Sequence, residues 1–441
     1  MLLRFIAENI YSFKGAAEFN TFPSSKSHSH EQHKISCAHA TALRLGAIYG
    51  ANGAGKSNLL SAIKLLKELV TFGSLNKVYL NGGLNFRFDP ACREKPSGLA
   101  IEFYQNEKVF YYHVEFKDRK VVLEELLLSK KTKDEIIFKR EDEQLQFGGE
   151  YLKGVTSTFL DALDRIVRPD MLFLSFFGEY YPNENELATE AYRWFTESLQ
   201  VVQPSAITGS LPHLMDISPD FLAMVNETLP ELKTGISALE VEKAVLTEDS
   251  VKGNDALATA FKGAQNNPDV PQILQNANGR ESINVVFEDG QVWKKSLVAV
   301  HRMADGTLFS APISIESDGT RRLIEYMPLF FAVTRTGGVF IVDEIERSVH
   351  PIMIKDIVSK ISASEKAVGQ LIFTTHESGL LDQDIFRPDE IWFAQKDSEQ
   401  ATQLYPLSDY NIHNTANIEK GYLAGRYGGI PFLSNLNDLH W

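Results

Sequence analysis

The chain has 441 residues, of which 44% are apolar and 23% charged, close to the average of globular proteins. This composition excludes disordered, collagen-like and disulfide-scaffold classes, and the length predicts roughly two to four structural units. Two cysteines are typical of a reducing compartment. No apolar run is long enough to cross a membrane, and the net charge of −14 argues against a surface built for nonspecific DNA binding. We therefore expect a soluble, cytoplasmic protein with no membrane partner.

Two short strands are predicted between Leu2 and Phe22, and the polar segment Ser24–His33 follows them. Its side chains His28, His30 and His33 could in principle hold a metal. No cysteine or patterned carboxylate accompanies them, so a metal site is disfavoured. We interpret the segment as an exposed loop.

The remainder of the N-terminal part, residues 1–150, contains one helix between two groups of strands. Ala47–Tyr49 predicts a short strand, and the apolar spacing of Ser57–Val70 predicts an amphipathic helix. Several strand-like segments then fill residues 99–147 with no helix between them, which predicts an antiparallel sheet.

The middle part, residues 151–282, has a mostly helical pattern. The candidate helices are Ser157–Ile166, Glu186–Val202 and Pro219–Leu229. The segment Gly253–Gly279 is rich in Asn, Gly and Ala and predicts a mobile connection. We expect this part to be a short helical insertion.

The C-terminal part, residues 283–441, begins with a predicted hairpin of Ile283–Phe287 and Val292–His301. Helices and buried strands then alternate, which is typical of a parallel sheet covered on both faces. The predicted helices are Thr320–Val333 and Pro351–Ser362, and the predicted strands are Val339–Val342, Gln370–Thr375 and Glu390–Ala394.

The segment Gly50–Ser57 matches G-x-x-x-x-G-K-[ST], with a short strand before it and an amphipathic helix after it. Backbone N–H groups of such a turn bind phosphates, Lys56 supplies a positive charge, and the Ser57 hydroxyl can ligate Mg²⁺. The sequence therefore predicts a nucleoside triphosphate site. Its candidate binding residues are Gly50, Asn52, Gly53, Gly55, Lys56, Ser57 and Asn58.

The pair Asp343-Glu344 ends the predicted buried strand Val339–Val342. Asp343 stands where a Walker-B aspartate holds Mg²⁺, and Glu344 is the candidate base that activates the attacking water. The alternative is that the two carboxylates only cap the next helix, because acidic residues favour helix starts.

Two further segments could complete a phosphate site. His376 follows a buried strand, at the edge where α/β sheets bind ligands, and could contact a γ-phosphate or orient water. Ser317 and Gly319 precede a predicted helix, whose N-terminal end could bind a second phosphate. The alternatives are a structural histidine and an ordinary helix cap.

The order of these segments resembles an ABC-type ATPase head, and more narrowly its SMC-like branch. The segments NIYSFKG, ESDGTRRL, DEIERSVHP and FTTHESGLLD further resemble the ATPases of prokaryotic abortive-infection and anti-phage systems, a group that includes the ATPase subunits of PARIS and Septu. The resemblance implies an α/β fold: a P-loop ATPase head with a mixed sheet core and an antiparallel β lobe, interrupted by a short helical insertion.

The resemblance also implies ATP and Mg²⁺ as cofactors, and a homodimer of heads or a higher oligomer. In that family two heads enclose the nucleotides, so Ser317 and Gly319 would contact the γ-phosphate held by Lys56 of another protomer. No Q-loop glutamine is evident after the first helix, and Gln105 is a poor candidate.

Two functions remain open at this point. The first is a sensor and scaffold that controls a separate toxic effector, a nuclease encoded nearby, in response to a phage protein or DNA. Only residues 377–441 follow His376, so we expect no nuclease domain in this chain. The alternative is a DNA-maintenance ATPase of the SMC type. The negative charge and the short insertion favour the first.

Overall fold

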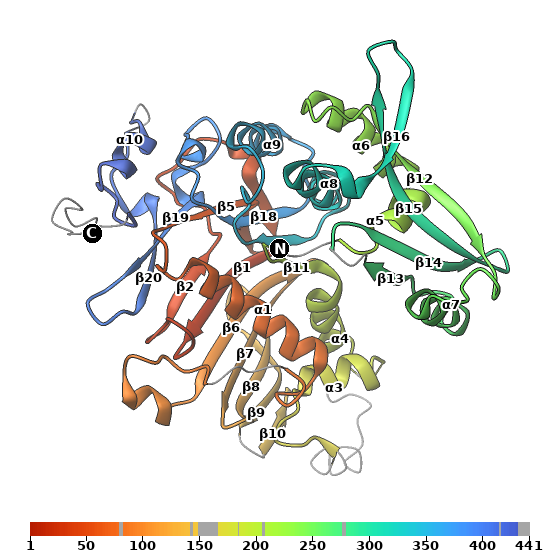
Figure 1. Cartoon of the computed structure of the whole chain (residues 1–441). Helices are drawn as coiled ribbons and strands as arrows, with labels where there is room; N and C mark the ends of the chain where they lie inside the picture. The colour runs from red at the N-terminus through yellow and green to blue at the C-terminus, as the bar shows by residue number, and fades with distance from the viewer. Residues whose placement is uncertain are drawn as a thin grey trace, which may run out of the picture. The chain divides into compact units, whose positions relative to one another are not determined.

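The structure is a computed structural model of the whole chain. It describes residues 1–78, 83–141, 144–148, 166–183, 185–204, 208–275, 279–413 and 416–430. The chain divides into two compact units (Figure 1). The first unit contains Met1–Pro204, Val333–Glu346 and Lys355–Trp441, and the second contains Ser205–Ala332 and Arg347–Ile354.

A six-stranded sheet in the order β11-β17-β18-β5-β19-β20 positions the motifs of the first unit. Neighbouring strands are parallel, except for the antiparallel pair β19–β20. Parallel strands end at the same edge of a sheet, so the residues that follow β5, β17 and β18 meet there. The strands are β5 (Leu45–Tyr49), β11 (Leu199–Val202), β17 (Val339–Val342), β18 (Gln370–Thr374), β19 (Ile391–Lys396) and β20 (Thr402–Pro406).

A seven-stranded antiparallel sheet forms the second layer of the first unit, in the order β10-β9-β8-β7-β6-β1-β2. It confirms the antiparallel sheet predicted for residues 99–147. Its strands are β1 (Leu2–Glu8), β2 (Ala17–Asn20), β6 (Ser97–Gln105), β7 (Lys108–Lys117), β8 (Lys120–Ser129), β9 (Glu135–Glu141) and β10 (Gln144–Phe147). A separate hairpin pairs β3 (Lys34–Cys37) with β4 (Ala40–Leu43).

Helix α1 (Lys56–Phe72) shares one apolar core with strands of both sheets. Leu59 and Leu66 of α1 belong to this core, together with Phe103 of β6 and Ile341 of β17. Burying one face of α1 in this way anchors the helix whose first turn carries Lys56. The other helices with residues in the first unit are α3 (Phe173–Tyr180), α4 (Glu186–Arg193), α9 (Pro351–Ala363) and α10 (Ile418–Leu423).

Helix α3 is capped by a buried carboxylate from the antiparallel sheet. Glu124 of β8 accepts hydrogen bonds from the backbone N–H groups of Phe173 (2.7 Å) and Leu174 (2.9 Å), and from the Tyr112 hydroxyl (2.9 Å). These N–H groups of a first helical turn have no partner within the helix. Glu124 therefore joins α3 to the sheet, and burial raises the pKa of its carboxyl.

The second unit consists of a five-stranded antiparallel sheet with helices around it (Figure 1). The strand order is β12-β15-β14-β13, and β16 pairs with β15. Its strands are β12 (Ala238–Leu246), β13 (Gln272–Gln275), β14 (Ser282–Glu288), β15 (Gln291–Arg302) and β16 (Leu308–Pro312). Its helices are α5 (Leu211–Ile217), α6 (Pro219–Glu231), α7 (Asp255–Asn266) and α8 (Asp318–Phe331).

The structure differs from the predicted helical pattern at three places in the middle of the chain. The helix predicted for Glu186–Val202 ends early, because Leu199–Val202 pairs with β17 as strand β11. Strand β12 lies where no strand was expected and is held by β15, more than 40 residues away along the chain. The predicted mobile connection, Gly253–Gly279, contains α7 and β13. The predicted helix Ser157–Ile166 lies outside the described residues except for Ile166.

The prediction of an exposed loop at Ser24–His33 is wrong at two residues, because Ser27 and His33 are buried. His33 is fully buried, and its ring nitrogens bond to the Glu390 carboxylate (2.9 Å) and to Ser362 (3.0 Å). These partners lie more than 320 residues away along the chain, so a local polar pattern could not indicate them.

Candidate nucleotide-binding site

The turn Gly50–Ser57 connects β5 to α1 at the carboxyl edge of the parallel sheet. Gly55 is the N-cap of α1 and has φ +109°, a conformation that residues with a Cβ rarely adopt. A Cβ at Gly55 would also collide with the Thr402 side chain and approach the Ser12 hydroxyl to 2.9 Å. Only glycine fits here, because the backbone of the turn packs directly on these two residues.

Lys56 is 5% exposed, and its ammonium is held within the turn. Its Nζ donates hydrogen bonds to the carbonyl oxygens of Gly50 (2.7 Å) and Ala51 (3.3 Å). Burial lowers the pKa of Lys56 to about 8, while the negative charge of Glu346 is the largest effect in the opposite direction. The ammonium therefore lies at the start of the turn, bonded to two of the turn's own carbonyl oxygens.

The predicted metal ligands Ser57 and Asp343 lie together although 286 residues separate them. The Ser57 hydroxyl donates a hydrogen bond to Asp343 Oδ1 (3.2 Å), and the buried Thr374 hydroxyl donates another to the same oxygen (2.6 Å). A hydroxyl and a carboxylate are the oxygen ligands that Mg²⁺ accepts alongside phosphate oxygens. This pair therefore fits Mg²⁺.

Thr374 was not among the sequence-predicted residues, yet it organises the end of the Walker-B strand. Besides its bond to Asp343, its Oγ1 accepts a hydrogen bond from the backbone N–H of Glu344 (2.8 Å). The available sequence signal was a hydroxyl residue at the end of the apolar strand β18, directly before Thr375 and His376.

Glu344 lies next to this network in a left-handed backbone conformation, with φ +51°. Non-glycine residues in this region carry a conformational cost and concentrate at functional sites. The alternative helix-cap interpretation does not fit Asp343, whose Oδ1 is occupied by Ser57 and Thr374, while the next helix begins only at Pro351. Half-buried at the sheet edge, the Glu344 carboxyl could activate a water.

His376 is exposed and follows β18 at the same edge. Its backbone N–H donates to Glu346 Oε1 (2.7 Å). Desolvation and the charge of Lys56 lower the pKa of its imidazole, which favours the neutral ring. A hollow of about 470 Å³ lies beside it, lined by Gly50, Ala51, Asn52, His376, Ser378, Tyr422, Leu423 and Ile430. His376 and the exposed Asn52 thus share one cavity.

The two other predicted binding residues lie in the turn and in the helix after it. Gly53 is an exposed residue of the turn, with φ +78°. Asn58 is half-buried in the first turn of α1.

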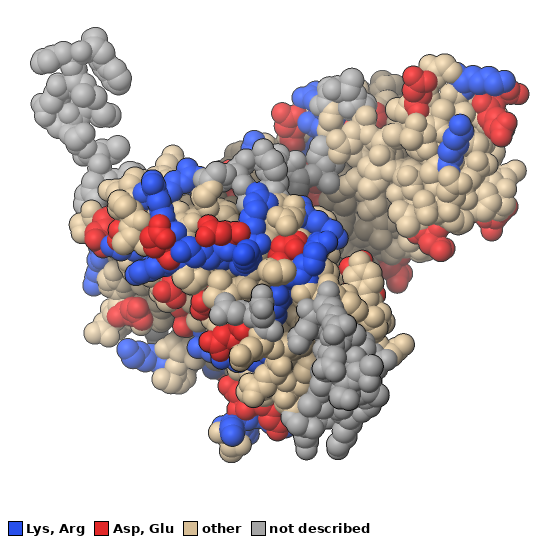
Figure 2. Space-filling view, turned by 90° about the horizontal axis from the view of Figure 1, so that it is seen from below, with Lys and Arg blue, Asp and Glu red and all other residues tan. Residues whose placement is uncertain are grey.

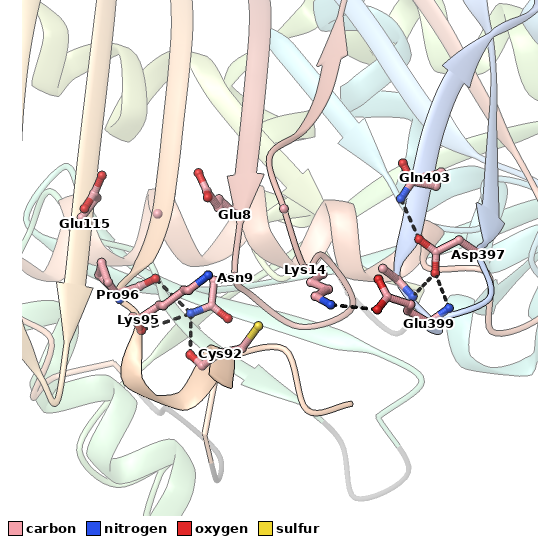
Figure 3. A pocket seen from close by; sticks show the side chains of 13 residues that line it. Glu8, Asn9, Lys14, Cys92, Lys95, Pro96, Glu115, Asp397, Glu399 and Gln403 are labelled. Atoms are coloured by element: carbon pink, nitrogen blue, oxygen red, sulfur yellow. Dashed lines mark hydrogen bonds and ion pairs between the residues drawn. The ribbon is translucent and has the colours of Figure 1, made fainter. Parts of the chain in front are cut away.

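Thr402 holds the phosphate turn through a hydrogen bond to Ala54, and Ser12 bonds to Thr402. Neither residue was predicted from the sequence. The Thr402 hydroxyl donates to the Ala54 carbonyl oxygen and bonds to the Ser12 hydroxyl, each at 2.8 Å. The neighbours of Thr402, Ala401 and Gln403, face a separate cavity of about 490 Å³ (Figure 3).

This cavity carries charges of both signs. Its Lys14 pairs with Glu399 (3.0 Å), and its Asp397 accepts hydrogen bonds from backbone N–H groups and from Gln403 (Figure 3). The bonds of Asp397 to the Ala401 N–H and to the Gln403 side chain hold the segment 401–403, which carries Thr402.

Ser317 and Gly319, which we call the signature residues, lie in the second unit, at the start of α8. Exposed Ser317 is the N-cap, and its Oγ accepts a hydrogen bond from the Thr320 N–H (3.1 Å). A Cβ at Gly319 would come within 2.5 Å of the Ser348 carbonyl oxygen, so a larger residue would displace the turn. Between them, Asp318 is paired with Arg321 and Arg280.

The phosphate turn connects a strand to a helix, and a Walker-B carboxylate lies beside it. This arrangement defines a P-loop nucleotide-binding protein. Residues 46–382 match the family model described as "AAA domain, putative AbiEii toxin, Type IV TA system". The match includes the phosphate turn, the signature, Walker B and His376, and the chain belongs to this family. AAA domains are ATPase domains, so the family implies ATP hydrolysis.

Three solved structures are similar to the chain at low identity. The SMC head domain from Thermotoga maritima is 12% identical, with 93% of this chain and 99% of that chain covered and a TM-score of 0.38. An SmcHead bound to the C-winged helix domain of ScpA is 13% identical (92% and 97% covered, TM-score 0.39). An Smc head domain with an extended coiled coil, bound to the C-terminal domain of ScpA derived from Pyrococcus furiosus, is 14% identical (92% and 96%, TM-score 0.37). No curated protein matches the chain significantly.

Across the part of the chain that the structure describes, no helix combines the length and apolar character needed to span a membrane.

Proposed function

We propose that this protein is an SMC-like ATPase that acts as sensor and scaffold for a separate toxic effector in anti-phage defence. The observation that carries the ATPase part of the proposal is that the hydroxyls of Ser57 and Thr374 both donate to Asp343 Oδ1, at the edge of the sheet where the phosphate turn begins. Such an arrangement is organised for a triphosphate and its metal.

Each candidate residue of the nucleotide site in the first unit has a distinct proposed role. The backbone of Gly50–Ser57 and the Lys56 ammonium bind the phosphates, and Ser57 and Asp343 hold Mg²⁺, which neutralises phosphate charge when bound. Glu344 accepts a proton from the attacking water, and neutral His376 donates a hydrogen bond to the γ-phosphate or orients that water. Asn52 and Asn58 flank the phosphates.

We further propose that turnover needs a second copy of the chain. Ser317 and Gly319 stand at the exposed N-terminal end of α8, where helix N–H groups favour an anion. In a homodimer or higher oligomer of heads, this end would complete the site of the neighbouring protomer. A transition state that lacks these donors is less stabilised, so hydrolysis would wait for association.

The family description, which names a putative AbiEii toxin of a Type IV TA system, supports a link to a toxin, and the charge of the chain favours a sensor over a DNA-binding ATPase. On the face seen in Figure 2, Lys and Arg side chains alternate with Asp and Glu instead of forming a field of one sign. DNA affinity comes largely from phosphate contacts, so such a face favours the sensor over a DNA-maintenance ATPase. We place the protein in the cytoplasm, where phage protein or DNA would act as its trigger.

The proposal is tested by co-expressing the chain with its neighbouring genes and purifying it with and without ATP. We expect one effector, a nuclease, to co-elute with the wild type and with a control variant at an exposed lysine, Lys77→Ala. ATP should change the retained amount of effector, and this change should disappear in Lys56→Ala. A chain that elutes alone and binds DNA with steep salt dependence would instead support the DNA-maintenance function.

A further inference from the structure

Glu346, two residues beyond Glu344, has two carboxylate oxygens in different surroundings. Its Oε1 accepts the hydrogen bond from the His376 backbone N–H at 2.7 Å. Its Oε2 is buried and has no hydrogen-bond partner in the described part of the chain. A buried carboxylate oxygen without a donor destabilises the fold, so its presence calls for a functional reason.

The charge of Glu346 acts on residues of the phosphate turn and of the strand before it. Among the carboxylates, its charge acts on Lys56 more strongly than those of Asp343 and Glu344. It also acts on Tyr49, the last residue of β5, whose buried hydroxyl likewise has no partner among the described residues. Glu346 therefore acts through its charge on Lys56 and on the end of β5, and bonds directly to His376.

Three consecutive residues after Walker B hold the end of β18. The Glu344 N–H donates to the Thr374 hydroxyl (2.8 Å), and the Ile345 N–H donates to the Thr374 carbonyl oxygen (3.2 Å). The third bond joins Glu346 to His376. Of these three bonds, only the third uses a side chain of residues 344–346, so it can be removed by substitution while the other two remain.

We infer that Glu346 is a positioning residue, which holds the backbone of His376 in place so that its imidazole meets the γ-phosphate. The inference rests on the proposed ATPase function and adds to it a residue that the Walker motifs do not include. Misplacing a reacting or orienting group by an ångström can lower a rate about 100-fold. Removing Glu346 should therefore lower kcat, while the phosphate turn keeps the KM for ATP nearly unchanged.

The test compares Glu346→Ala, Glu346→Gln, His376→Ala and the double variant in an ATPase assay. We expect Glu346→Ala to lower kcat about 10- to 100-fold with little change in KM. Glu346→Gln retains an acceptor for the His376 N–H and should recover most of this loss. In the His376→Ala background, Glu346→Ala should cause little further loss, because a positioning residue has nothing left to position. The exposed Glu365→Ala serves as the matched control.

Hydrogen exchange of the His376 amide provides a readout that does not depend on turnover. Glu346→Ala should accelerate this exchange, whereas Glu346→Gln and Glu365→Ala should not. Equal losses of kcat in the wild-type and His376→Ala backgrounds would overturn the inference, as would unchanged amide exchange in Glu346→Ala. If the wild type shows no hydrolysis that depends on Lys56, the proposed ATPase function fails together with the inference. If hydrolysis depends on Lys56 but not on Glu346, only the inference fails.

Discussion

The two units present their phosphate-related residues in different ways. In the first unit, Lys56, Ser57 and Asp343 are bonded to partners within the unit, and Asp343 is joined to Ser57 across 286 residues of sequence. In the second unit, Ser317 is exposed and bonds to Thr320, within its own helix turn. The difference shows that bonds between distant segments fix the residues of the first unit, whereas local bonds within one helix turn fix Ser317, which stays exposed.

The largest effect should come from Lys56→Ala, which removes the buried charge of the phosphate turn. We expect no measurable ATP binding by isothermal titration calorimetry, because the backbone N–H groups alone cannot balance the triphosphate charge. Undiminished binding would show that nucleotide does not bind at this turn.

Glu344→Gln should retain binding and lose turnover. The amide cannot accept the proton of the attacking water, so the rate of ATP hydrolysis should fall about 10²- to 10⁴-fold. Bound ATP should accumulate, and the associated form should increase in size-exclusion chromatography. A rate equal to that of the wild type would exclude Glu344 as the base.

Ser317→Arg tests the second unit. The bulky cation at the start of α8 should remove the donors offered to a neighbouring site and lower turnover about 10²- to 10³-fold, without preventing association. ATP affinity of the dilute chain should remain that of the wild type. Normal turnover would mean that the signature end takes no part in catalysis.

Thr374→Val should give a smaller loss in the first unit. The substitution keeps the shape but removes the hydroxyl that orients Asp343 and the Glu344 N–H. We expect a loss of about 1–3 kcal/mol in the free energy of unfolding and a moderate loss of turnover. Thr374→Ser, which keeps the hydroxyl, should restore both, and failure to do so would assign the effect to packing.

Glu124→Ala should not affect nucleotide affinity, because Glu124 caps α3 and has no bond to the site residues. Burial raises the pKa of Glu124 above its ordinary value of 4.5. The folded state therefore holds this proton more tightly than the unfolded state, and the stability that Glu124 contributes falls as pH rises above about 4.5. In urea unfolding, the difference between wild type and variant should be largest near pH 4 and smaller at pH 8. A difference that grows with pH would contradict this sign.

The sequence predicted best those features that are determined locally. The turn Gly50–Ser57 and helix α1 follow from adjacent residues, and the structure has them where they were expected. Strand β11 was missed because β17, about 140 residues later, determines its conformation. Thr374 and the buried His33 were missed for the same reason: their partners are set by the order of strands in the sheet.

The most direct test of a shared site mixes two inactive variants, Lys56→Ala and Ser317→Arg, and measures ATP hydrolysis. A mixed dimer contains one site with an intact Lys56 from one protomer and an intact Ser317 from the other. With equal amounts and free exchange, half of the dimers are mixed, so activity should return to about a quarter of the wild-type value. Mixed dimers that form, but hydrolyse no more ATP than the separate variants, would contradict a site completed by the neighbouring copy.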